Sequence, residues 1–374
     1  MKILIGGSPC THWSIAQTKN RETEASGIGW ELFLNYRIAR DKYHPDYFLY
    51  ENNKSMSPAI RAQITAELGV EPVLINSALV SAQNRQRLYW VGKREPDGTY
   101  SQVRVEQPED KGILLRDILE SGAVTWHEKA YTLRASAATK QGVSNVLRHI
   151  ETNGHFGYMG VAEPVNMTVD GKAQCLRATY YKDGIRNMVG NTVDRKTCVA
   201  VPVGTATGPQ SILVVTAPGK SMPVYEVRNG RIAIKGKEYP IKLADGFYII
   251  RKLTVTECKR LQTVPDTYAF PVSDTQAYKM LGNGWTVDVI VHIMSHFEGL
   301  TAEPVEVLSM YDGMSCGHIA LDKLGVDITA YYATEIDKYA VQTTKHNFPE
   351  TVQLGDAFQV RDEEWRPRRA EGVE

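Results

Sequence analysis

The chain has 374 residues, of which 43% are hydrophobic, and this is enough for one large domain and a smaller one around a real core. Its 43 Lys and Arg balance its 43 Asp and Glu, so the overall charge neither indicates nor excludes a nucleic-acid partner. The five cysteines contain no CxxC pair, which argues against a disulfide framework and a structural zinc site and indicates a reducing, intracellular compartment. We expect neither a signal peptide nor a membrane span, because no apolar run is long enough.

Residues 1–93 predict an α/β arrangement. Strands are expected at Lys2–Ile5, at Tyr47–Tyr50 and in the segments EPVLINSALV and RLYWVGKR, with helices over residues 29–42 and Pro58–Leu68. This alternation predicts parallel strands joined by crossover helices. The first strand runs into a Gly-Gly-Ser-Pro-Cys turn, and such a turn belongs at the carboxyl edge of a sheet, where α/β enzymes build their sites.

Residues 94–250 differ in composition. Gly, Thr and Val dominate, helical periodicity disappears and turn signals recur, which predicts a β-rich domain. The segment KAYTLRAS at Lys129–Ser136 is echoed by KAQCLRAT at Lys172–Thr179, either as two β-hairpins with similar packing or as one strand-loop unit used twice on a binding face. Residues 129–196 hold ten Lys and Arg against five Asp and Glu, so the neutral total hides a basic middle, as in a module that binds a polyanion.

Helices return after residue 250. Thr254 and Glu257 form a predicted capping box at the start of one helix, and WTVDVIVHIMSHF has the pattern of an amphipathic helix. The segment VEVLSMYDGMSCGHIALDKLG predicts a strand, a Gly-containing turn and a helix. Two further strands end at Glu335 and at Gly355–Asp356, and residues 361–374 predict a surface tail.

The last three predicted strands place candidate ligand-binding groups at their ends. The turn after the first allows the backbone to approach a ligand closely, and Glu335 ends the second strand where a ribose-binding carboxylate belongs. Asp356 ends the third strand and could accept a hydrogen bond from an adenine amino group. A single acid of this kind is more typical of a solvated strand end, but acids at the ends of successive strands favour a nucleoside-cofactor site.

A second group of reactive side chains follows the first strands. Cys10 follows Pro9 at the end of a strand, close to backbone N–H groups, and a thiol placed there can act as a nucleophile. Glu51 ends the neighbouring strand. Arg85 and Arg87 have the spacing of one strand face and suit a base carbonyl or a phosphate. The alternatives are a small buried cysteine and a solvated strand face.

Eight short motifs together resemble those of the DNA cytosine-C5 methyltransferases: GGSPC, ENN, QNRQRLYWVG, RKLTVTECKRLQTVP, LGNGWTV, VLSMYDGMSCG, ATEID and LGD. The Ser before Pro-Cys, the Asp-Gly in MYDGMSCG and the Trp in GNGWTV are most similar to the branch of phage and de novo-type enzymes. The motifs cover residues 1–93 and 251–356, and residues 94–250 take the place of the variable target-recognition domain. The resemblance implies a Rossmann-like mixed sheet of the S-adenosylmethionine-dependent methyltransferase type, with a smaller β-rich target-recognition domain.

The order of the motifs departs from the family pattern. In the family the cofactor motifs come first and Pro-Cys follows, whereas here MYDGMSCG, ATEID and LGD come last. The chain therefore resembles a circular permutant, with the catalytic half in residues 1–93 and the rest of the methyltransferase domain, including the cofactor half, in residues 251–360. The segment FEGLTAEPVEV would join the helix after GNGWTV to the first cofactor strand, and such rewiring is tolerated where the loop ends are neighbours.

The resemblance also implies a mechanism and residue roles. Cys10 would attack C6 of a cytosine flipped out of duplex DNA, Glu51 would bind N3 and the exocyclic amine, and Arg87 with Arg85 would hold the base O2 and a nearby phosphate. C5 would then take the methyl group of S-adenosylmethionine, leaving S-adenosylhomocysteine, and no metal is needed. The positions that match cofactor-contacting positions of the family are Ser8, Leu32, Asn283, Trp285, Tyr311, Asp312, Gly313, Met314, Ser315, Cys316, Glu335, Ile336, Asp356 and Ala357. The candidate DNA contacts are Ser14, Arg134, Asn145, Arg177, Lys182 and Arg186.

Three alternatives stand beside this interpretation. The first is a catalytically silent DNA-binding relative. The presence of Cys10, Glu51, Arg87 and a full cofactor set argues against it, because a silent relative need not keep them. The same chemistry on transfer RNA is disfavoured by the long basic middle domain, because the RNA branch has a smaller one. An unrelated methyltransferase for small molecules would not explain Pro-Cys together with ENN and QNRQR. We therefore expect a monomeric enzyme of the restriction-modification type that acts on double-stranded DNA in the cytoplasm of a prokaryotic or phage-infected cell.

Overall fold

The structure is a computed structural model that describes residues 1–9, 12–14, 21–120, 123–125, 128–130, 132–133, 161–164, 200–202, 212–217, 220–234, 236–251 and 253–368. The chain forms two compact units. The first consists of Met1–Ile113 and Lys259–Glu374, and the second of Leu114–Cys258. The candidate catalytic and cofactor motifs lie in the first unit.

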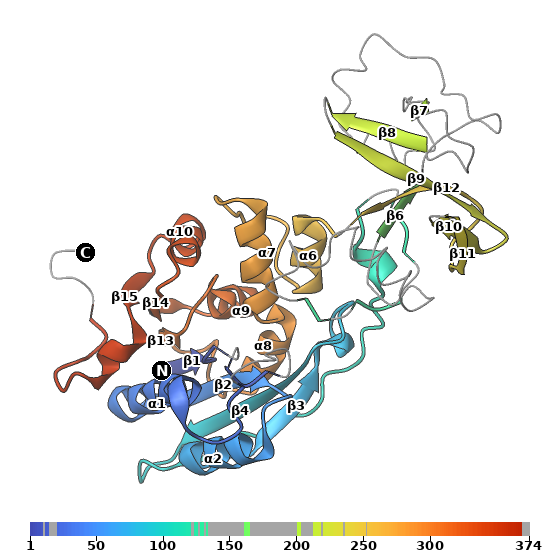
Figure 1. Ribbon diagram of the computed structural model, residues 1–374. Coiled ribbons are helices and arrows are strands. Elements are labelled where there is room, and N and C mark those ends of the chain that lie inside the picture. The colour runs from blue at the N-terminus through green and yellow to red at the C-terminus, as the bar shows by residue number, and fades with distance from the viewer. Residues whose placement is uncertain are drawn as a thin grey trace. The chain divides into compact units, whose positions relative to one another are not determined.

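The first unit holds one mixed sheet with helices around it (Figure 1). Its strands are β1 (Lys2–Gly6), β2 (Tyr47–Asn53), β3 (Pro72–Asn76), β4 (Gln86–Arg94), β5 (Tyr100–Gln102), β13 (Val305–Met310), β14 (Ile328–Thr334) and β15 (Val352–Gly355). Its helices are α1 (Gly27–Tyr43), α2 (Pro58–Leu68), α7 (Asp274–Asn283), α8 (Val287–Met294), α9 (Cys316–Leu324) and α10 (Lys338–Asn347), and α6 (Val255–Leu261) crosses the boundary between the units. Short 3-10 helices lie at η2 (Ser77–Leu79) and η5 (Ala357–Arg361).

The strand order of this sheet is β15-β14-β13-β1-β2-β4-β3, with β5 paired to β4. The first five strands are parallel, which confirms the predicted Rossmann-like part of the sheet. The expectation that all strands of residues 1–93 are parallel is wrong, because β4 runs antiparallel to both β2 and β3. The link between β3 and β4 contains only η2 and a turn, so no crossover helix is available to bring β4 back in the parallel direction.

Strand β1 lies inside the sheet although it begins the printed sequence. It pairs with β13 on one side and with β2 on the other. The Met1 ammonium group donates a hydrogen bond to the carbonyl oxygen of Pro304 at 2.8 Å, and the backbone N–H of Lys2 donates to Asp46 at 2.7 Å. The first residues of the strand are therefore held from both sides.

Helices cover both faces of this sheet. Helices α1 and α2 lie on one side of it and α8 and α9 on the other (Figure 1). Leu4 belongs to a core cluster with residues of α1, α2 and η5. On the opposite face, a Cβ added to Gly317 of α9 would lie 2.1 Å from the Cδ1 atom of Ile5, so only glycine lets this helix approach β1 so closely.

Helix α2 begins and ends where the sequence predicts. The side chain of Ser57 accepts a hydrogen bond from the backbone N–H of Ile60 at 3.2 Å, and Pro58 occupies the first helical position, where a missing N–H costs nothing. Gly69 follows the helix with φ of 75°, the left-handed conformation that ends many helices. Local capping signals alone account for these limits.

The second unit is β-rich, as predicted. Its described strands form an antiparallel sheet in the order β11-β10-β9-β12-β6, with β8 paired to β9 and β7 to β8. Their bounds are β6 (Val161–Pro164), β7 (Ala200–Pro202), β8 (Ile212–Ala217), β9 (Lys220–Arg228), β10 (Arg231–Ile234), β11 (Lys237–Pro240) and β12 (Gly246–Arg251), after the 3-10 helix η3 (Leu115–Ile118). Half of the first repeated segment and all of the second lie outside the described residues, so neither explanation of the repeat is tested.

The predicted capping box of helix α6 is present. The Thr254 hydroxyl oxygen accepts from the backbone N–H of Glu257 at 3.2 Å, and the Glu257 carboxylate accepts from the backbone N–H of Thr254 at 2.8 Å. The same buried carboxylate binds both terminal nitrogens of Arg251 at 2.8 and 2.9 Å, so it ties the end of β12 to the helix.

The segment after residue 360 is not simply a surface tail. Arg361 donates to the side chain of Asn35 at 2.6 Å and to the carboxylate of Glu31 at 2.7 Å, both in α1. Trp365 packs against the core cluster that contains Leu4. Across the described ranges, no three or more His, Cys, Asp or Glu side chains are grouped so that they could hold a metal ion, and no helix is long and apolar enough to cross a membrane.

Candidate active site

The five parallel strands end in one row across the sheet. The paired residues of that row are Gly6, Tyr50, Met310, Thr334 and Gly355. One residue further along, each strand reaches a segment that the sequence singles out, at Gly7, Glu51, Tyr311, Glu335 and Asp356. Because the carboxyl ends of parallel strands meet at one edge, the structure brings the predicted cofactor and catalytic segments together there.

The turn after β13 has a strained backbone. Tyr311, Gly313 and Ser315 have φ of 61°, 60° and 58°, and two of the three are not glycine. Strain of this kind is concentrated at functional sites. The Tyr311 hydroxyl donates to the carbonyl oxygen of Leu32 in α1 at 2.7 Å, which fixes one end of the turn. A Cβ added to Gly313 would meet no atom within 4 Å, so the turn presents its backbone to open space at this position.

Glu335 ties this turn to the next strand end. One carboxylate oxygen accepts from the backbone N–H of Gly313 at 2.9 Å, and the other accepts from the N–H groups of Ile336 and Asp337 at 2.8 and 2.7 Å. The side chain of Ile336 is 75% exposed and leaves an apolar surface beside these polar groups. Asp356 is exposed, and one of its carboxylate oxygens accepts from the N–H of Phe358 at 2.9 Å.

Several predicted cofactor residues point their side chains into the protein. The Asp312 carboxylate accepts from the Tyr331 hydroxyl at 2.8 Å and from the Ser315 hydroxyl, and burial raises the pKa of Asp312 to about 6. Burial also raises the pKa of the Cys316 thiol to about 12, so this thiol is protonated at neutral pH. Met314 is 2% exposed. At these positions the turn offers a ligand its backbone rather than its side chains.

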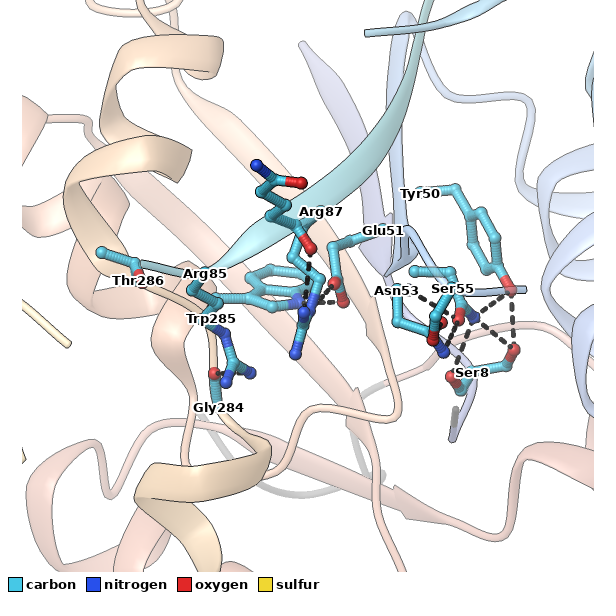
Figure 2. A network of polar contacts seen from close by, with 12 residues as sticks. Ser8, Tyr50, Glu51, Asn53, Ser55, Arg85, Arg87, Gly284, Trp285 and Thr286 are labelled. Carbon is cyan, nitrogen blue, oxygen red and sulfur yellow. Dashed lines mark hydrogen bonds and ion pairs between the residues drawn. The ribbon is translucent and has the colours of Figure 1, made fainter. Parts of the chain in front are cut away.

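Glu51 lies between donors from two different elements (Figure 2). Its Oε1 atom is 3.0 Å from the Nε of Arg87 in β4, and its Oε2 accepts from the indole N–H of Trp285 at 2.9 Å. Glycine is required opposite this carboxylate, because a Cβ on Gly7 would lie 3.0 Å from Oε2 and 2.9 Å from the Glu51 carbonyl oxygen. The residues of the GGSPC and ENN motifs therefore fit together by close approach.

Ser8 belongs to a buried polar network beside this carboxylate (Figure 2). Its hydroxyl is 2.6 Å from the hydroxyl of Tyr50, and the Asn52 side-chain amide donates to the Tyr50 hydroxyl at 3.1 Å and to the Ser8 carbonyl at 3.2 Å. Asn52 also accepts from the backbone N–H of Asn53 at 2.8 Å. The network fixes the backbone just before the position of the predicted nucleophile.

The two-residue spacing predicts that Arg85 and Arg87 share one strand face, but in the structure they do not. Arg85 precedes β4 and is 3% exposed. Its guanidinium group donates to the carbonyl oxygen of Gly282 at 3.3 Å and to that of Gly284 at 2.9 Å (Figure 2). These contacts favour a role in holding the loop between α7 and α8, whereas Arg87 remains beside the candidate base-binding carboxylate.

The predicted nucleophile, Cys10, lies outside the described residues. The described residues after it are held firmly. The buried indole of Trp13 donates to the carboxylate of Glu22 at 3.0 Å, and Arg21 donates to the carbonyl oxygens of Trp13 and Ser55 at 3.1 and 2.6 Å. Ser14 is partly buried, and the other candidate DNA contacts, Arg134, Asn145, Arg177, Lys182 and Arg186, lie outside the described residues.

Sequence reasoning missed Gln262, which is fully buried and organises the Gly282–Thr286 loop. Its side-chain N–H₂ donates to the carbonyl oxygens of Leu281 and Gly284 at 2.6 and 3.3 Å. Its side-chain oxygen accepts from the Thr286 hydroxyl at 2.8 Å. Gln262 directly follows helix α6 in a polar stretch, so no local pattern marked it as buried, although a buried amide must find partners. Two further predicted cofactor positions differ in exposure. Asn283, the last residue of α7, is exposed, and Ala357, which follows Asp356 after β15, is buried.

The sequence of this chain is similar to those of known proteins. A sequence model of the family described as C-5 cytosine-specific DNA methylase matches residues 1–298. The type II methyltransferase M.HpaII of Haemophilus parainfluenzae is 26% identical over 300 residues, which cover 77% of this chain and 69% of that protein. The orphan methyltransferase M.SPRI of Bacillus phage SPR is 23% identical over 365 residues, covering 78% of this chain and 81% of that one.

Among solved structures, the Entamoeba histolytica methyltransferase EhMeth is 13% identical with a TM-score of 0.38, covering 79% of this chain and 76% of that chain. The family match extends over most of the sequence, including the segments that supply Ser8, Glu51, Arg87 and Trp285 to one site. The chain belongs to the C-5 cytosine-specific DNA methylase family.

Proposed function

We propose that this chain transfers the methyl group of S-adenosylmethionine to C5 of a cytosine flipped out of duplex DNA, through a covalent adduct between Cys10 and C6. The observation that carries the proposal is the position of Glu51. Its carboxylate lies between Arg87 and Trp285, next to the Gly7–Pro9 turn that leads to Cys10, and in the same row of strand ends as the turn after β13.

The residues of this site divide the reaction between them. The Cys10 thiolate attacks C6, and Glu51 stabilises the proton on N3 as electron density moves to C5. When bound, S-adenosylmethionine supplies an activated methyl group on a sulfonium, which needs no further electrophilic activation. After methyl transfer the C5 proton leaves to a base, the C5–C6 double bond re-forms and the C6–S bond breaks, which returns the Cys10 thiolate. Arg87 orients Glu51 and faces the same base.

The residues at the ends of β13 and β14 fit such a cofactor. Gly313 leaves open space where any other residue would place a Cβ, which suits close approach of the methionine part to the backbone. Glu335 has its carboxylate fixed by three backbone N–H groups and would accept from a ribose hydroxyl with the one acceptor position that remains on Oε2. The exposed side chain of Ile336 would pack against the adenine, and Asp356 would accept from its amino group.

Labelled-methyl transfer to unmethylated duplex DNA tests this function. The wild type should label DNA, and Cys10→Ala should abolish transfer while it still binds S-adenosylhomocysteine. Transfer that survives in Cys10→Ala contradicts the adduct mechanism. A wild type that binds DNA without transferring methyl groups would be a silent relative, and preferential labelling of transfer RNA would assign the same chemistry to RNA. Bisulfite sequencing of the labelled DNA then identifies the base and the target site together.

A separate measurement tests the cofactor side. Glu335→Ala should weaken binding of S-adenosylhomocysteine far more than binding of DNA, because Glu335 lies in the row of cofactor segments and not beside Glu51. Isothermal titration with each ligand alone separates the two affinities. An unchanged cofactor affinity would place the cofactor elsewhere.

We also propose that the chain is a circular permutant of its family. The support is that β13, β14 and β15 follow β1 by about 300 residues in the sequence but continue its sheet in parallel, with β13 beside β1, β14 beside β13 and β15 beside β14. Joining residues 303–368 through a short Gly/Ser linker to residues 1–302 restores the family order. This rejoined variant should fold and bind S-adenosylhomocysteine with wild-type affinity. Failure to fold would mean that the observed order is needed for this sheet.

A further inference from the structure

One nitrogen of the protein lies at each oxygen of the Glu51 carboxylate, through an ion pair with Arg87 and a hydrogen bond from Trp285. Arg87 approaches Oε1 and Trp285 approaches Oε2, at 3.0 and 2.9 Å. A carboxylate oxygen can accept two hydrogen bonds. At least one acceptor position therefore remains on each oxygen. A cytosine protonated at N3 needs one on each, for its adjacent N3–H and exocyclic N–H groups. In this arrangement the two protein donors set the direction of the positions left for the base.

The residues before and after Trp285 in the sequence are held by buried side chains. Arg85 donates to the carbonyl oxygens of Gly282 and Gly284, and the side chain of Gln262 binds Gly284 and the Thr286 hydroxyl. Arg85 and Gln262 are both almost fully buried. Buried polar groups with satisfied hydrogen bonds make a rigid support for the Gly282–Thr286 loop.

The same loop lies against the cofactor turn. A Cβ added to Gly284 would come within 3.1 Å of the Cys316 sulfur and 3.5 Å of the Met314 sulfur. Met314 and Cys316 follow Gly313, whose backbone faces the proposed cofactor position. Two neighbouring residues of one loop thus make both contacts. Gly284 lies against the turn proposed to bind the cofactor, and Trp285 donates to the carboxylate proposed to bind the base.

We infer that Trp285 is a positioning residue that couples cofactor binding to recognition of the target base. This inference rests on the proposed function and adds a role for the indole N–H that cofactor contact does not require. A bound cofactor restrains the turn at Gly313–Cys316, the turn restrains Gly284, and the indole N–H then fixes Glu51 in the orientation that accepts cytosine. Coupling free energies are reciprocal, so a bound base must strengthen cofactor binding by the same factor.

The coupling can be measured directly. The Kd of S-adenosylhomocysteine is determined by calorimetry with and without a saturating duplex that contains a site methylated by the wild type, and the ratio of the two Kd values is the coupling factor. In the wild type we expect a ratio of about 5 to 150, the usual range for coupled sites. Trp285→Phe keeps the aromatic ring and removes the N–H, and it should bring the ratio down to about 1.

Trp90→Phe is the matched control. The buried indole of Trp90 in β4 donates to the Thr65 hydroxyl at 3.0 Å, in a hydrogen bond that does not involve Glu51. This variant loses an equivalent hydrogen bond and should keep the wild-type ratio. A double-mutant cycle completes the test, because Trp285→Phe should change nothing further in a Glu51→Ala background if the indole acts through that carboxylate.

The outcomes separate the two levels of the hypothesis. A wild type that methylates DNA but whose Kd ratio is 1, or is equal in Trp285→Phe, overturns the coupling and leaves the proposed function intact. A Trp285→Phe effect of equal size in the Glu51→Ala background also overturns it, since the indole would then act through other atoms. A wild type that binds no S-adenosylhomocysteine at all removes the proposed function, and the coupling falls with it.

Discussion

The buried amide of Gln262 provides a strong test of how the Gly282–Thr286 loop is held. Substitution by Met keeps a similar length and volume but removes both the donor and the acceptor. The carbonyl oxygen of Leu281 then loses its donor at 2.6 Å, and the hydroxyl of Thr286 loses its acceptor at 2.8 Å. Gly284 keeps the donor from Arg85. An orphaned buried polar group costs about 1–3 kcal/mol, so two of them should lower the free energy of unfolding by about 2–6 kcal/mol.

The same substitution at a glutamine of the sheet should have little effect on stability. The side-chain amide of Gln353 in β15 has no hydrogen-bond partner among the described residues. Replacing it with Met orphans no other group, so Gln353→Met should change the free energy of unfolding by less than about 1 kcal/mol. Denaturant unfolding of both variants, followed by circular dichroism, gives the comparison. If Gln262→Met is no less stable than Gln353→Met, the hydrogen bonds assigned to Gln262 do not hold this loop.

Three further predictions follow from the same sheet edge. Gly313→Ala and Gly325→Ala both place a Cβ at positive φ in open space, and each should cost about 1–2 kcal/mol of stability. Only Gly313→Ala should weaken S-adenosylhomocysteine binding. Equal affinities of the two variants would place the cofactor away from this turn. Because the pKa of Asp312 in the folded protein is raised to about 6, the stability of the wild type relative to Asp312→Asn should be highest below pH 4 and fall as the pH rises from about 4 to 6; a difference that does not vary with pH contradicts the burial of this carboxylate. The amides of Ile3–Ile5 should exchange slowly with solvent, because β1 is paired on both sides; rapid exchange would mean that the sheet does not hold this strand end.

Local signals in the sequence account for both ends of helix α2 and for the start of helix α6. The limits of α2 follow from Ser57, Pro58 and Gly69, and the start of α6 follows from the Thr254–Glu257 capping box. Capping and turn preferences act over three or four residues, so one stretch of sequence contains all the information they need. The motifs at strand ends likewise predicted which segments meet at the sheet edge, because parallel strands place their carboxyl ends together.

The tertiary structure decided how those segments contact one another. Arg85 and Arg87 differ by two positions, yet one supports a loop near residue 284 and the other reaches Glu51, because Arg85 comes before β4 begins. Strand β4 runs antiparallel to its neighbours because no crossover helix lies between β3 and β4. The link from Trp285 to Glu51 joins residues 234 positions apart, and no local pattern encodes it. The sequence by itself determined the family and the helix caps, whereas folding decided which donor serves which acceptor, since that choice depends on packing between distant elements.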